Sequence, residues 1–404
     1  MVENGPLRIL IVHNKHQYLG GEEAVVRSEQ ELLESKGHRV VCFTRDSADI
    51  RRYSFFRKMA LGLTAVWSQA SYNQVRRLLS REHFDIAHFH NFFPLISPAA
   101  HHACREAGVP IVQTLHNFRL LCDNALFFRD GHICEECVTY GPWRGIMHGC
   151  YRSSRVQTAA VACMLYYHRW RHTWKDAVDV YIALSNFSRQ KFIQAGLRPE
   201  GIVVKPNFLS FDPGVRESAG DYVVYVGRLE PEKRVHNLLE AWRFLPDIPL
   251  RIVGTGRSTR RLLEMRRRLG ATSISFLGEL PFEEVLCIIK GSRFLVFPSL
   301  WYENFPRVLG EAFACGVPVL CCGLGSMLEI VEHGKTGLFF EPGSEEALVT
   351  KARWMWEHSD AVLRLGCAAR VEFEAKYSAQ RNYQLMMDIY AQAIAHRDEK
   401  KRNG

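Results

Sequence analysis

The stretch RFLVFPSLWYENFPRVLGEAFACGVPVLCC, residues 293–322, contains one complete strand–helix–strand unit. Its two ends, RFLVFPS and VPVLCC, are short apolar runs typical of buried strands. Between them, Pro306 suits the first helical position because it lacks the N–H that has no partner there. Gly316 suits the position just past a helix end. We therefore expect a helix from Arg307 to Cys315 between two parallel strands.

The same alternation of strands and helices fills the chain twice. Further strand candidates in the second half are 221–229, 249–256 and 273–278, and those in the first half are 8–13, 38–44, 84–90, 110–116 and 179–185. Alternation of this kind indicates parallel sheets covered by helices, and its restart indicates two such domains. The boundary is expected in the Pro-, Gly- and Ser-rich segment 205–220. The predicted fold class is α/β, with two Rossmann-like domains.

Composition limits the class of protein further. The chain has 404 residues, of which 47% are hydrophobic, enough for two or three packed cores. No stretch reaches the roughly 18 apolar residues of a membrane span, and the N-terminus lacks the pattern of a secretion signal. We expect a cytoplasmic protein whose 12 cysteines are reduced thiols or metal ligands.

Positive charge is concentrated in the first half. Residues 1–210 hold 26 Lys and Arg against 18 Asp and Glu, whereas residues 211–404 hold 26 against 25. Two basic segments, 50–81 and 138–175, contain no acid at all, and the first repeats apolar residues at helical spacing. A basic amphipathic helix can lie on an anionic membrane surface, so peripheral binding to the inner face of the membrane is one interpretation. Packing of each apolar stripe on its own sheet is the other.

The ends of the predicted strands nominate site residues. Parallel α/β sheets bind ligands beyond the carboxyl ends of their strands, and two facing domains would turn these ends toward a shared cleft. The residues at or just after such ends are Gly20, Gly21, His116, Arg228, Lys233, Gly254, Gly256 and Glu303.

The two glutamates around the expected helix suggest the ligand. The backbone amides around Asn304 to Arg307, a stretch that includes Phe305 and Pro306, lie at the start of the expected helix and suit an anion. Glu311 lies over one turn inside, where a carboxylate would accept hydrogen bonds from ribose hydroxyls rather than approach phosphate. With Glu303 on a second sugar, the pattern favours a nucleotide sugar.

Several stretches resemble the retaining GT-B glycosyltransferases of the GT4 family, glycosyl transferases group 1. They are YENFPRVLGEAFACGVPVL (302–320), with its E-x7-E spacing, and, in the expected order for that family, GGEEAVVRSEQELLESKGHRV (20–40), VYVGRLEPEKRVHNLLEAW (224–242), RIVGTG (251–256), SISFLGELPFEEV (273–285) and EIVEHGKTGLFFEPGSEEAL (329–348). The resemblance covers nearly the whole chain and is loosest over residues 50–180. It implies an acceptor-binding domain at 1–207, a donor-binding domain at 208–380 and a C-terminal helix at 381–404 that returns to the first domain.

The resemblance also implies roles for individual residues. Arg228 and Lys233 would bind the donor diphosphate, Glu303 the donor sugar, Glu311 the ribose, and His116 the region of the reacting carbon. Gly20 and Gly21 would allow a close approach of the loop to phosphate or acceptor.

We expect catalysis without a metal cofactor. The chain has no Asp-x-Asp pair to hold a divalent ion, and Arg228 and Lys233 can stabilise the leaving group instead. Expected partners are a UDP- or GDP-sugar donor and a carbohydrate or lipid-linked acceptor, and no nucleic acid. For a retaining reaction we favour attack on the face that the diphosphate leaves over a covalent intermediate on Glu303.

Four cysteines, Cys122, Cys134, Cys137 and Cys150, follow the spacing C-x11-C-x2-C-x12-C. One Cys-x-x-Cys knuckle with two flanking cysteines could hold a structural zinc ion, with His132 or His148 as a substitute ligand. The family resemblance does not support zinc, and buried cysteines often act as small apolar residues.

Three other functions are weaker interpretations. A nucleotide-sugar epimerase could share the architecture, and only a transfer assay separates it from a transferase. A nicotinamide-dependent oxidoreductase lacks its glycine-rich loop after the first strand. A zinc-stabilised nucleic-acid-binding protein fits the sequence pI of about 9.0 but leaves Glu303 and Glu311 unexplained.

Overall fold

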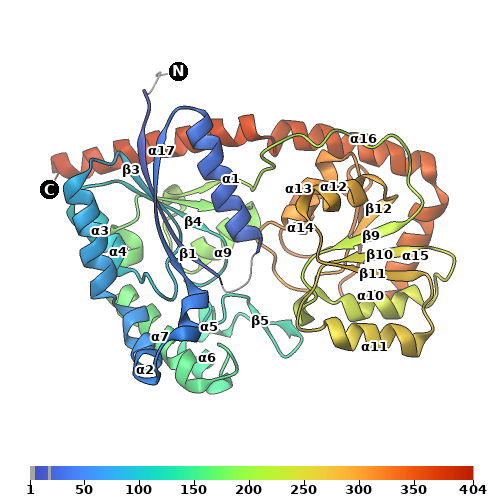
Figure 1. Ribbon diagram of the computed structural model, residues 1–404, viewed down its shortest axis with the longest axis horizontal. Helices are drawn as coiled ribbons and strands as arrows, with labels where there is room; N and C mark the ends of the chain where they lie inside the picture. Colours follow the sequence, from blue (N-terminus) through green and yellow to red (C-terminus); the bar gives the residue numbers. More distant parts are fainter. Residues whose placement is uncertain (1–4, 17–19, 404) are drawn as a thin grey trace. The chain divides into compact units, whose positions relative to one another are not determined.

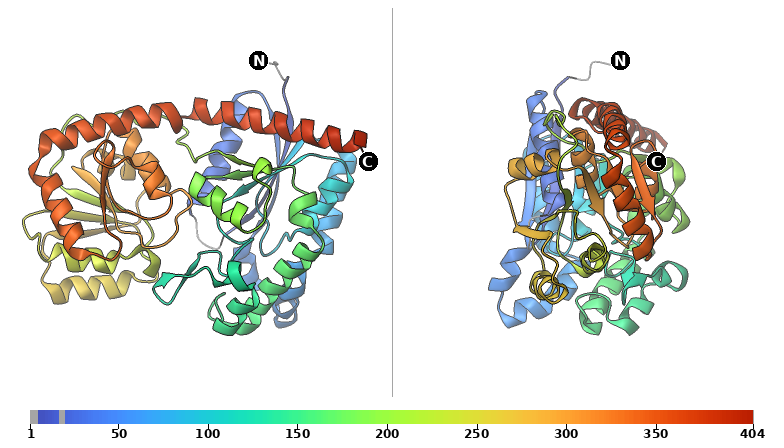
Figure 2. Two further views of the ribbon diagram at one scale, coloured as in Figure 1. Left: turned by 180° about the vertical axis from the view of Figure 1, so that it is seen from behind. Right: turned by 90° about the vertical axis from the view of Figure 1, so that its right-hand side faces the viewer.

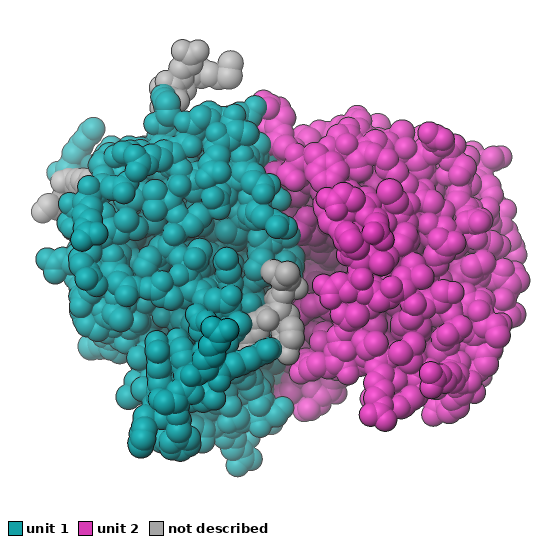
Figure 3. All heavy atoms as spheres, viewed as in Figure 1, with its two compact units in different colours: residues 1–127, 134–206, 382–404 teal, residues 128–133, 207–381 magenta. Residues whose placement is uncertain are grey.

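The computed structural model describes residues 5–16 and 20–403 (Figure 1). The chain divides into two compact units, each described here by itself (Figure 3). Unit 1 comprises residues 1–127, 134–206 and 382–404, and unit 2 comprises residues 128–133 and 207–381. The units therefore change at 206/207 and 381/382, where the sequence predicted 207/208 and 380/381. The short segment 128–133, expected in the first domain, belongs to unit 2.

Unit 1 is built on a six-stranded sheet in the order β2-β1-β3-β4-β7-β8, with every strand pair parallel. The strands are β1 (Arg8–Lys15), β2 (Arg39–Asp46), β3 (Ile86–Asn91), β4 (Ile111–Leu115), β7 (Val180–Ala183) and β8 (Ile202–Val204). The first five match predicted strands. The edge strand β8 was not predicted, because three residues carry too short a periodic signal.

Unit 2 is built on a second six-stranded parallel sheet, in the order β11-β10-β9-β12-β13-β14. Its strands are β9 (Val223–Val226), β10 (Leu250–Val253), β11 (Ile274–Gly278), β12 (Phe294–Phe297), β13 (Val319–Cys322) and β14 (Gly337–Phe340). This is the doubly wound order 3-2-1-4-5-6, whose direction of winding reverses between β9 and β12. Ligands of such sheets bind beyond the strand ends at this reversal. The predicted fold class is confirmed for both units.

Helices cover both sheets. Those of unit 1 are α1 (Gly21–Ser35), α2 (Phe55–Val66), α3 (Gln69–Arg81), α4 (Ala99–Glu106), α5 (Glu136–Tyr140), α6 (Trp143–His148), α7 (Arg155–Trp170), α8 (Thr173–Asp176) and α9 (Asn186–Gln194), with short 3-10 turns at Ser47–Arg52 and Pro199–Gly201. Those of unit 2 are α10 (Val235–Trp242), α11 (Thr259–Leu269), α12 (Phe282–Lys290), α13 (Arg307–Ala314), α14 (Met327–Ile330), α15 (Glu345–Glu357) and α16 (Ser359–Lys376), with a 3-10 turn at Pro231–Lys233 and the two-stranded hairpin β5 (Phe128–Arg129) and β6 (His132–Ile133).

The last helix, α17 (Ala379–Asn403), packs on the sheet of unit 1 from Asn382 onward (Figure 2). Met386, Ile389 and Tyr390 join the same buried core as Ile9 and Ile86. Near its end, the Arg397 guanidinium donates to Oδ2 of the buried Asp179 at 2.7 and 3.1 Å. Apolar burial together with a paired charge thus joins the C-terminal segment to unit 1.

The basic segment 50–81 forms two helices rather than one continuous helix. The α2 helix ends at Val66, and the side chain of Ser68 caps α3 by accepting a hydrogen bond from the Ser71 N–H. The capping serine explains the break because its side chain satisfies an amide that a continuous helix would bond internally. No described helix is both long and apolar enough to span a bilayer.

Candidate active site

Glu303 lies on the connection that follows β12, on the side of the reversal point of the unit 2 sheet, and is 6% exposed. Three donors converge on its Oε1 atom: Lys233 Nζ at 2.5 Å, Ser299 Oγ at 2.7 Å and Trp301 Nε1 at 2.7 Å. The other oxygen, Oε2, accepts no hydrogen bond from the described residues. A carboxylate oxygen with free lone pairs, on a side chain held by three bonds, suits the hydroxyl of a ligand.

Lys233 follows β9 on a 3-10 turn and is 9% exposed. Besides Glu303, its ammonium lies 5.3 Å from the ring centroid of Phe297 and 5.4 Å from that of Trp301. Both rings can interact favourably with a cation. The positive charge of Lys233 is therefore held in one place beside Glu303.

Arg228 lies on the same connection after β9, and its side chain is exposed and has no hydrogen-bond or ion-pair partner in the described part of the chain. The hydroxyl of Tyr225 donates to its carbonyl oxygen at 3.1 Å. Burial raises the pKa of Tyr225, the charge of Glu303 raises it further, and the charge of Arg228 lowers it. Arg228 and Glu303 thus both lie close enough to act on one phenol. The structure brings Arg228, Lys233 and Glu303 to one region of unit 2.

Gly254 and Gly256, which follow β10, support the loop that carries Arg228. A Cβ atom on Gly254 would lie 2.1 Å from the carbonyl oxygen of Gly227, and one on Gly256 would lie 2.5 Å from that of Leu229. Backbone hydrogen bonds join the same two loops, from the Leu229 N–H to Thr255 O at 2.9 Å, among others. Only glycine permits this approach of two backbones. Contact of these glycines with a donor stays a prediction.

Glu311 lies on α13, is 8% exposed, and pairs with Nη2 of Arg307 at 3.4 Å. Burial raises the pKa of its carboxyl, and Arg307 opposes this rise. The helix ends as predicted near Gly316, which has φ +67°, with Val317 N–H donating to Ala312 O at 2.8 Å. It begins at Arg307, as expected, with Pro306 just before the first helical residue, and it ends at Ala314, one residue earlier than expected.

The three residues before α13, which belong to the predicted anion site, are buried. Phe305 packs edge-on against Tyr377 with the ring centroids 5.2 Å apart, and its carbonyl accepts from Asn207 at 3.3 Å. Asn304 is 8% exposed, and Pro306 caps the helix without a side-chain hydrogen bond. The binding roles of Asn304, Phe305, Pro306 and Glu311 stay predictions.

In unit 1, His116 follows the end of β4 and is half-buried, and burial lowers its pKa. Gly20 caps the start of α1, and its N–H donates to Glu23 Oε2 at 3.1 Å. The other oxygen of Glu23 accepts from the His16 N–H at 2.7 Å. The Glu23 carboxylate thus accepts a hydrogen bond from both His16 and Gly20. The expected roles of His116, Gly20 and Gly21, and the shared cleft, stay predictions.

Glu22 pairs with His16 in the same region, with Nε2 of His16 3.3 Å from Oε2 of Glu22. Burial acts to raise the pKa of the Glu22 carboxyl, but the neighbouring histidine outweighs it and holds this pKa at about 2. Glu22 is therefore a carboxylate at neutral pH.

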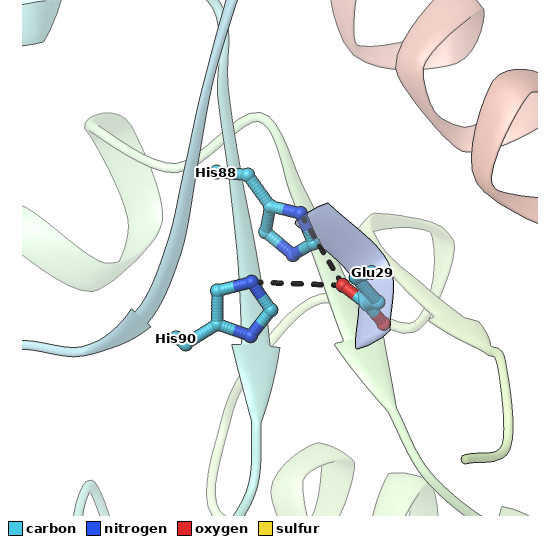
Figure 4. A group of neighbouring side chains, drawn as sticks. All are labelled: Glu29, His88 and His90. Carbon is cyan, nitrogen blue, oxygen red and sulfur yellow. Dashed lines mark ion pairs between the residues drawn. The ribbon is translucent and has the colours of Figure 1, made fainter. Parts of the chain in front are cut away.

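In the interior of unit 1, Glu29, His88 and His90 form a buried group whose potential metal-ligand atoms lie within 4.8 Å of one another (Figure 4). The group does not suit a metal ion. Both ring nitrogens of His88 are engaged, with Tyr390 Oη and Thr114 Oγ1, each at 2.8 Å. The Lys205 ammonium lies 2.6 Å from Glu29 Oε1 and would repel a divalent cation.

The four cysteines of the predicted zinc site lie in unit 1, two buried and two half-buried. A side-chain hydrogen bond links Cys122 to Cys137 and lowers the pKa of Cys122 to about 6. Within residues 5–16 and 20–403, Glu29, His88 and His90 are the only group of metal-type ligand atoms that all lie within 4.8 Å of one another, and the four sulfur atoms do not form such a group. Zinc binding by Cys122, Cys134, Cys137 and Cys150 stays a prediction.

The sequence did not predict several polar residues that surround Glu303 in unit 2 and His116 in unit 1. Ser299 and Trp301 hold Glu303, and Glu29, His90 and Lys205 lie behind His116. A signal existed for some of them. Glu29 occupies the buried stripe of α1 with Val25, Val26 and Leu33, and the two histidines of β3 alternate with apolar residues in a fully buried strand. A charge in a core stripe needs a buried partner, which the sequence alone does not identify.

Comparison with known proteins assigns the family. The model for glycosyl transferases group 1 matches residues 211–371, and the model for glycosyltransferase family 4 matches residues 19–212. The chain belongs to the GT4-type, group 1 glycosyltransferases. This confirms the resemblance to the GT4 family, and retention of configuration stays a prediction.

Two bacterial relatives and one solved structure illustrate the kinship. The chain is 28% identical over 206 residues to O-antigen chain mannosyltransferase B of Escherichia coli, covering 45% of this chain and 53% of that one. It is 30% identical over 167 residues to the D-rhamnosyltransferase WbpZ of Pseudomonas aeruginosa, covering 41% and 44%. The chain thus matches about half the length of these curated relatives. Anabaena HepE shares the GT-B fold with a TM-score of 0.67 at 19% identity, over 95% of this chain and 99% of HepE.

Proposed function

We propose that the protein transfers a sugar from a nucleoside-diphosphate sugar to a hydroxyl acceptor, with retention of the anomeric configuration. The observation that carries this proposal is the placement of Lys233, Glu303 and Arg228 at the reversal point of the unit 2 sheet. Two cations there suit a diphosphate, and a carboxylate with one unbonded oxygen suits a sugar hydroxyl.

Arg228 and Lys233 would act on the leaving group. As the bond between the anomeric carbon and the diphosphate breaks, negative charge grows on the phosphate oxygen. A held ammonium and an unpaired guanidinium stabilise that charge without reorganising. We propose that these two cations carry this role with no divalent ion. Retention of full activity in a strong chelator is the expected result, and loss of activity restored by a divalent ion contradicts it.

The step that retains configuration would proceed on one face of the sugar. The acceptor oxygen forms its bond to the anomeric carbon on the side from which the diphosphate departs. The electron pair of the broken bond stays on the leaving phosphate oxygen, and a phosphate oxygen takes the acceptor's proton. Glu303 is engaged by three donors on Oε1, which supports a role in holding sugar hydroxyls over a role as nucleophile. A covalent glycosyl–enzyme intermediate on Glu303 would overturn this mechanism.

The relatives support the donor and acceptor classes. HepE was solved with UDP and with UDP-glucose, which makes a UDP-sugar the first donor to test and a GDP-sugar the second. The names of the two bacterial relatives place them in sugar transfer, one of them to O-antigen chains. We propose a growing polysaccharide or a lipid-linked sugar as the acceptor here.

The test has two stages. A thermal-shift screen against UDP-, GDP- and ADP-sugars identifies the donor, because a ligand that binds the folded state raises the melting temperature. The preferred donor, labelled in the sugar, is then incubated with lipid-linked and polysaccharide acceptors. Label transferred to acceptor, with the donor's anomeric configuration in the product, supports the proposal. Conversion of the donor to an epimer without transfer supports the epimerase instead.

We also propose that unit 1 binds an anionic membrane through α2 and α7. The surface consists of Phe55, Phe56, Met59 and Leu63 on α2 with Tyr166 and Trp170 on α7, and Phe56 is 81% exposed. The helices pack closely, since a Cβ atom on Gly62 would lie 3.2 Å from Ala160 Cβ. Lysine and arginine flank these apolar side chains, and residues 50–81 carry no acid. Exposed apolar side chains with lysine and arginine nearby in the sequence match the interface of an anionic bilayer.

Vesicle flotation tests this surface. The wild type is expected to float with vesicles that contain phosphatidylglycerol and not with pure phosphatidylcholine, and less at high salt. The variant Phe55→Ser/Phe56→Ser/Leu63→Ser should stay unbound. The matched control Leu328→Ser/Val371→Ser removes exposed apolar side chains from unit 2 and should bind as the wild type does. Equal binding to both vesicle types, or self-association of the protein that the triple variant abolishes, contradicts the proposal.

A further inference from the structure

A chain of polar side chains leads from His116 into the interior of unit 1. Nε2 of His116 lies 3.0 Å from Nδ1 of His90, and the two rings stack with centroids 5.3 Å apart. On the far side of His90, Nε2 faces Oε2 of Glu29 at 3.6 Å (Figure 4). Oε1 of Glu29 lies 2.6 Å from Nζ of Lys205. Glu29, His90 and Lys205 are all at most 4% exposed.

The charge states of this chain follow from its surroundings. Burial acts to raise the pKa of the Glu29 carboxyl, but the adjacent Lys205 ammonium outweighs it and lowers that pKa. Burial also lowers the pKa of His90 well below its ordinary value. Glu29 is therefore a carboxylate, and His90 is a neutral imidazole with a single N–H.

The neighbouring atoms determine which ring nitrogen of His90 carries this hydrogen. Neither Glu29 Oε2 nor His90 Nε2 has a hydrogen-bond partner in the described part of the chain. If His90 were protonated on Nδ1, the lone pair of Nε2 would face a carboxylate oxygen and both buried atoms would stay unsatisfied. Protonation on Nε2 directs the N–H toward Glu29 instead. Nδ1 of His90 is then an acceptor, so Nε2 of His116 must carry the hydrogen of their shared bond.

We propose that Lys205, Glu29 and His90 are positioning residues that hold His116 in the tautomer protonated on Nε2, with Nδ1 left as an acceptor. His116 then accepts a hydrogen bond from a ligand hydroxyl and does not offer a positive charge to phosphate. This role for His116 rests on the proposed sugar transfer, but the tautomer is a property of unit 1 and can be measured without any substrate. The same chain orients the imidazole ring, as carboxylates do behind histidines in other sites.

The test is a two-bond hydrogen–nitrogen correlation spectrum of protein labelled with nitrogen-15 in histidine. Comparison with His116→Gln identifies the His116 signals. In the wild type we expect Nε2 of His116 protonated and Nδ1 unprotonated. Protonation on Nδ1 overturns the proposal, whether or not the protein transfers sugar.

The variant Glu29→Gln should invert the tautomer. Lys205 would take the single amide oxygen, so the amide nitrogen would face His90 Nε2 and require a lone pair there. His90 would then donate from Nδ1, and His116 would carry its hydrogen on Nδ1. Glu34→Gln, on an exposed position of the same helix, is the matched control and should leave the spectrum unchanged. A folded Glu29→Gln protein with an unchanged His116 tautomer overturns the proposal, and if this variant does not fold, the wild-type spectrum decides alone.

Discussion

Nζ of Lys233 lies 2.5 Å from Oε1 of Glu303, and both side chains are buried at the reversal point of the unit 2 sheet. Ser299 and Trp301 donate to the same oxygen, so the carboxylate is held from one side only. Its second oxygen is left for a ligand. This one-sided arrangement supports the proposal that Glu303 orients a sugar beside cations that bind diphosphate.

Replacing Glu303 with glutamine should weaken the sugar contact and spare the nucleotide. The amide oxygen can replace Oε1 toward the three donors, which places an amide donor where Oε2 accepted from a hydroxyl. A hydrogen bond to a charged group is worth about 1.5–3 kcal/mol, so kcat/KM should fall roughly tenfold to a hundredfold. Calorimetric titration should show unchanged affinity for the free nucleoside diphosphate. Glu264→Gln, on an exposed surface of α11, should change neither quantity. An equal loss of affinity for the nucleoside diphosphate in Glu303→Gln would show that Glu303 does not act on the sugar alone.

Replacing Lys233 with methionine should reduce stability as well as diphosphate affinity. The change leaves Glu303 as a buried carboxylate without its counter-charge, which costs about 3–5 kcal/mol. The urea midpoint of the transition should therefore fall markedly. Lys335→Met removes an exposed partner of Glu332 and should leave the midpoint nearly unchanged. Equal midpoints for the two variants would show that the Lys233–Glu303 pair is not formed.

Replacing Gly256 with alanine should weaken donor binding from a distance. Its new Cβ atom would lie 2.5 Å from the Leu229 carbonyl oxygen, so the loop that carries Arg228 must move. We expect a folded protein whose affinity for the nucleoside diphosphate is reduced. Gly201→Ala has open space around its Cβ position and should bind like the wild type. If Gly256→Ala bound the nucleoside diphosphate with wild-type affinity, the loop that carries Arg228 would not contribute to donor binding.

The buried Asp123 should make stability depend on pH. Burial raises the pKa of its carboxyl from 3.8 to about 7 in the folded chain. The folded state therefore holds a proton that the unfolded state releases, and this contribution is full below about pH 4 and is lost as pH rises through about 7. Melting temperatures of Asp123→Asn should decline less than those of the wild type across this range. Parallel curves for the two proteins would mean that Asp123 is already ionised when folded.

The sequence predicted the fold well because most strands of both sheets are apolar segments with clear boundaries. It missed β8 and β14, which have three and four residues. It also predicted the helix of residues 307–315 within one residue at its C-terminal end, since proline and glycine mark its ends. The segment 50–81 was harder, because the break at Ser68 depends on a capping bond within an otherwise helical pattern.

The candidate site divides in the same way. Arg228, Lys233 and Glu303 follow strand ends, so topology alone predicted their proximity. The partners of His116 could not be found in this manner, because Glu29, His90 and Lys205 come from three distant segments and meet only when α1 packs on the sheet. The close approach of two loops at Gly254 and Gly256 could not be predicted either, because the atoms next to these glycines are backbone atoms of another loop.

The central claim is tested most directly by a crystal structure of the protein with its preferred nucleotide sugar. We expect diphosphate oxygens within hydrogen-bond distance of Arg228 and Lys233, ribose hydroxyls on Glu311, and a sugar hydroxyl on Oε2 of Glu303. A diphosphate bound away from Arg228 and Lys233, or a ribose that does not contact Glu311, would contradict the account.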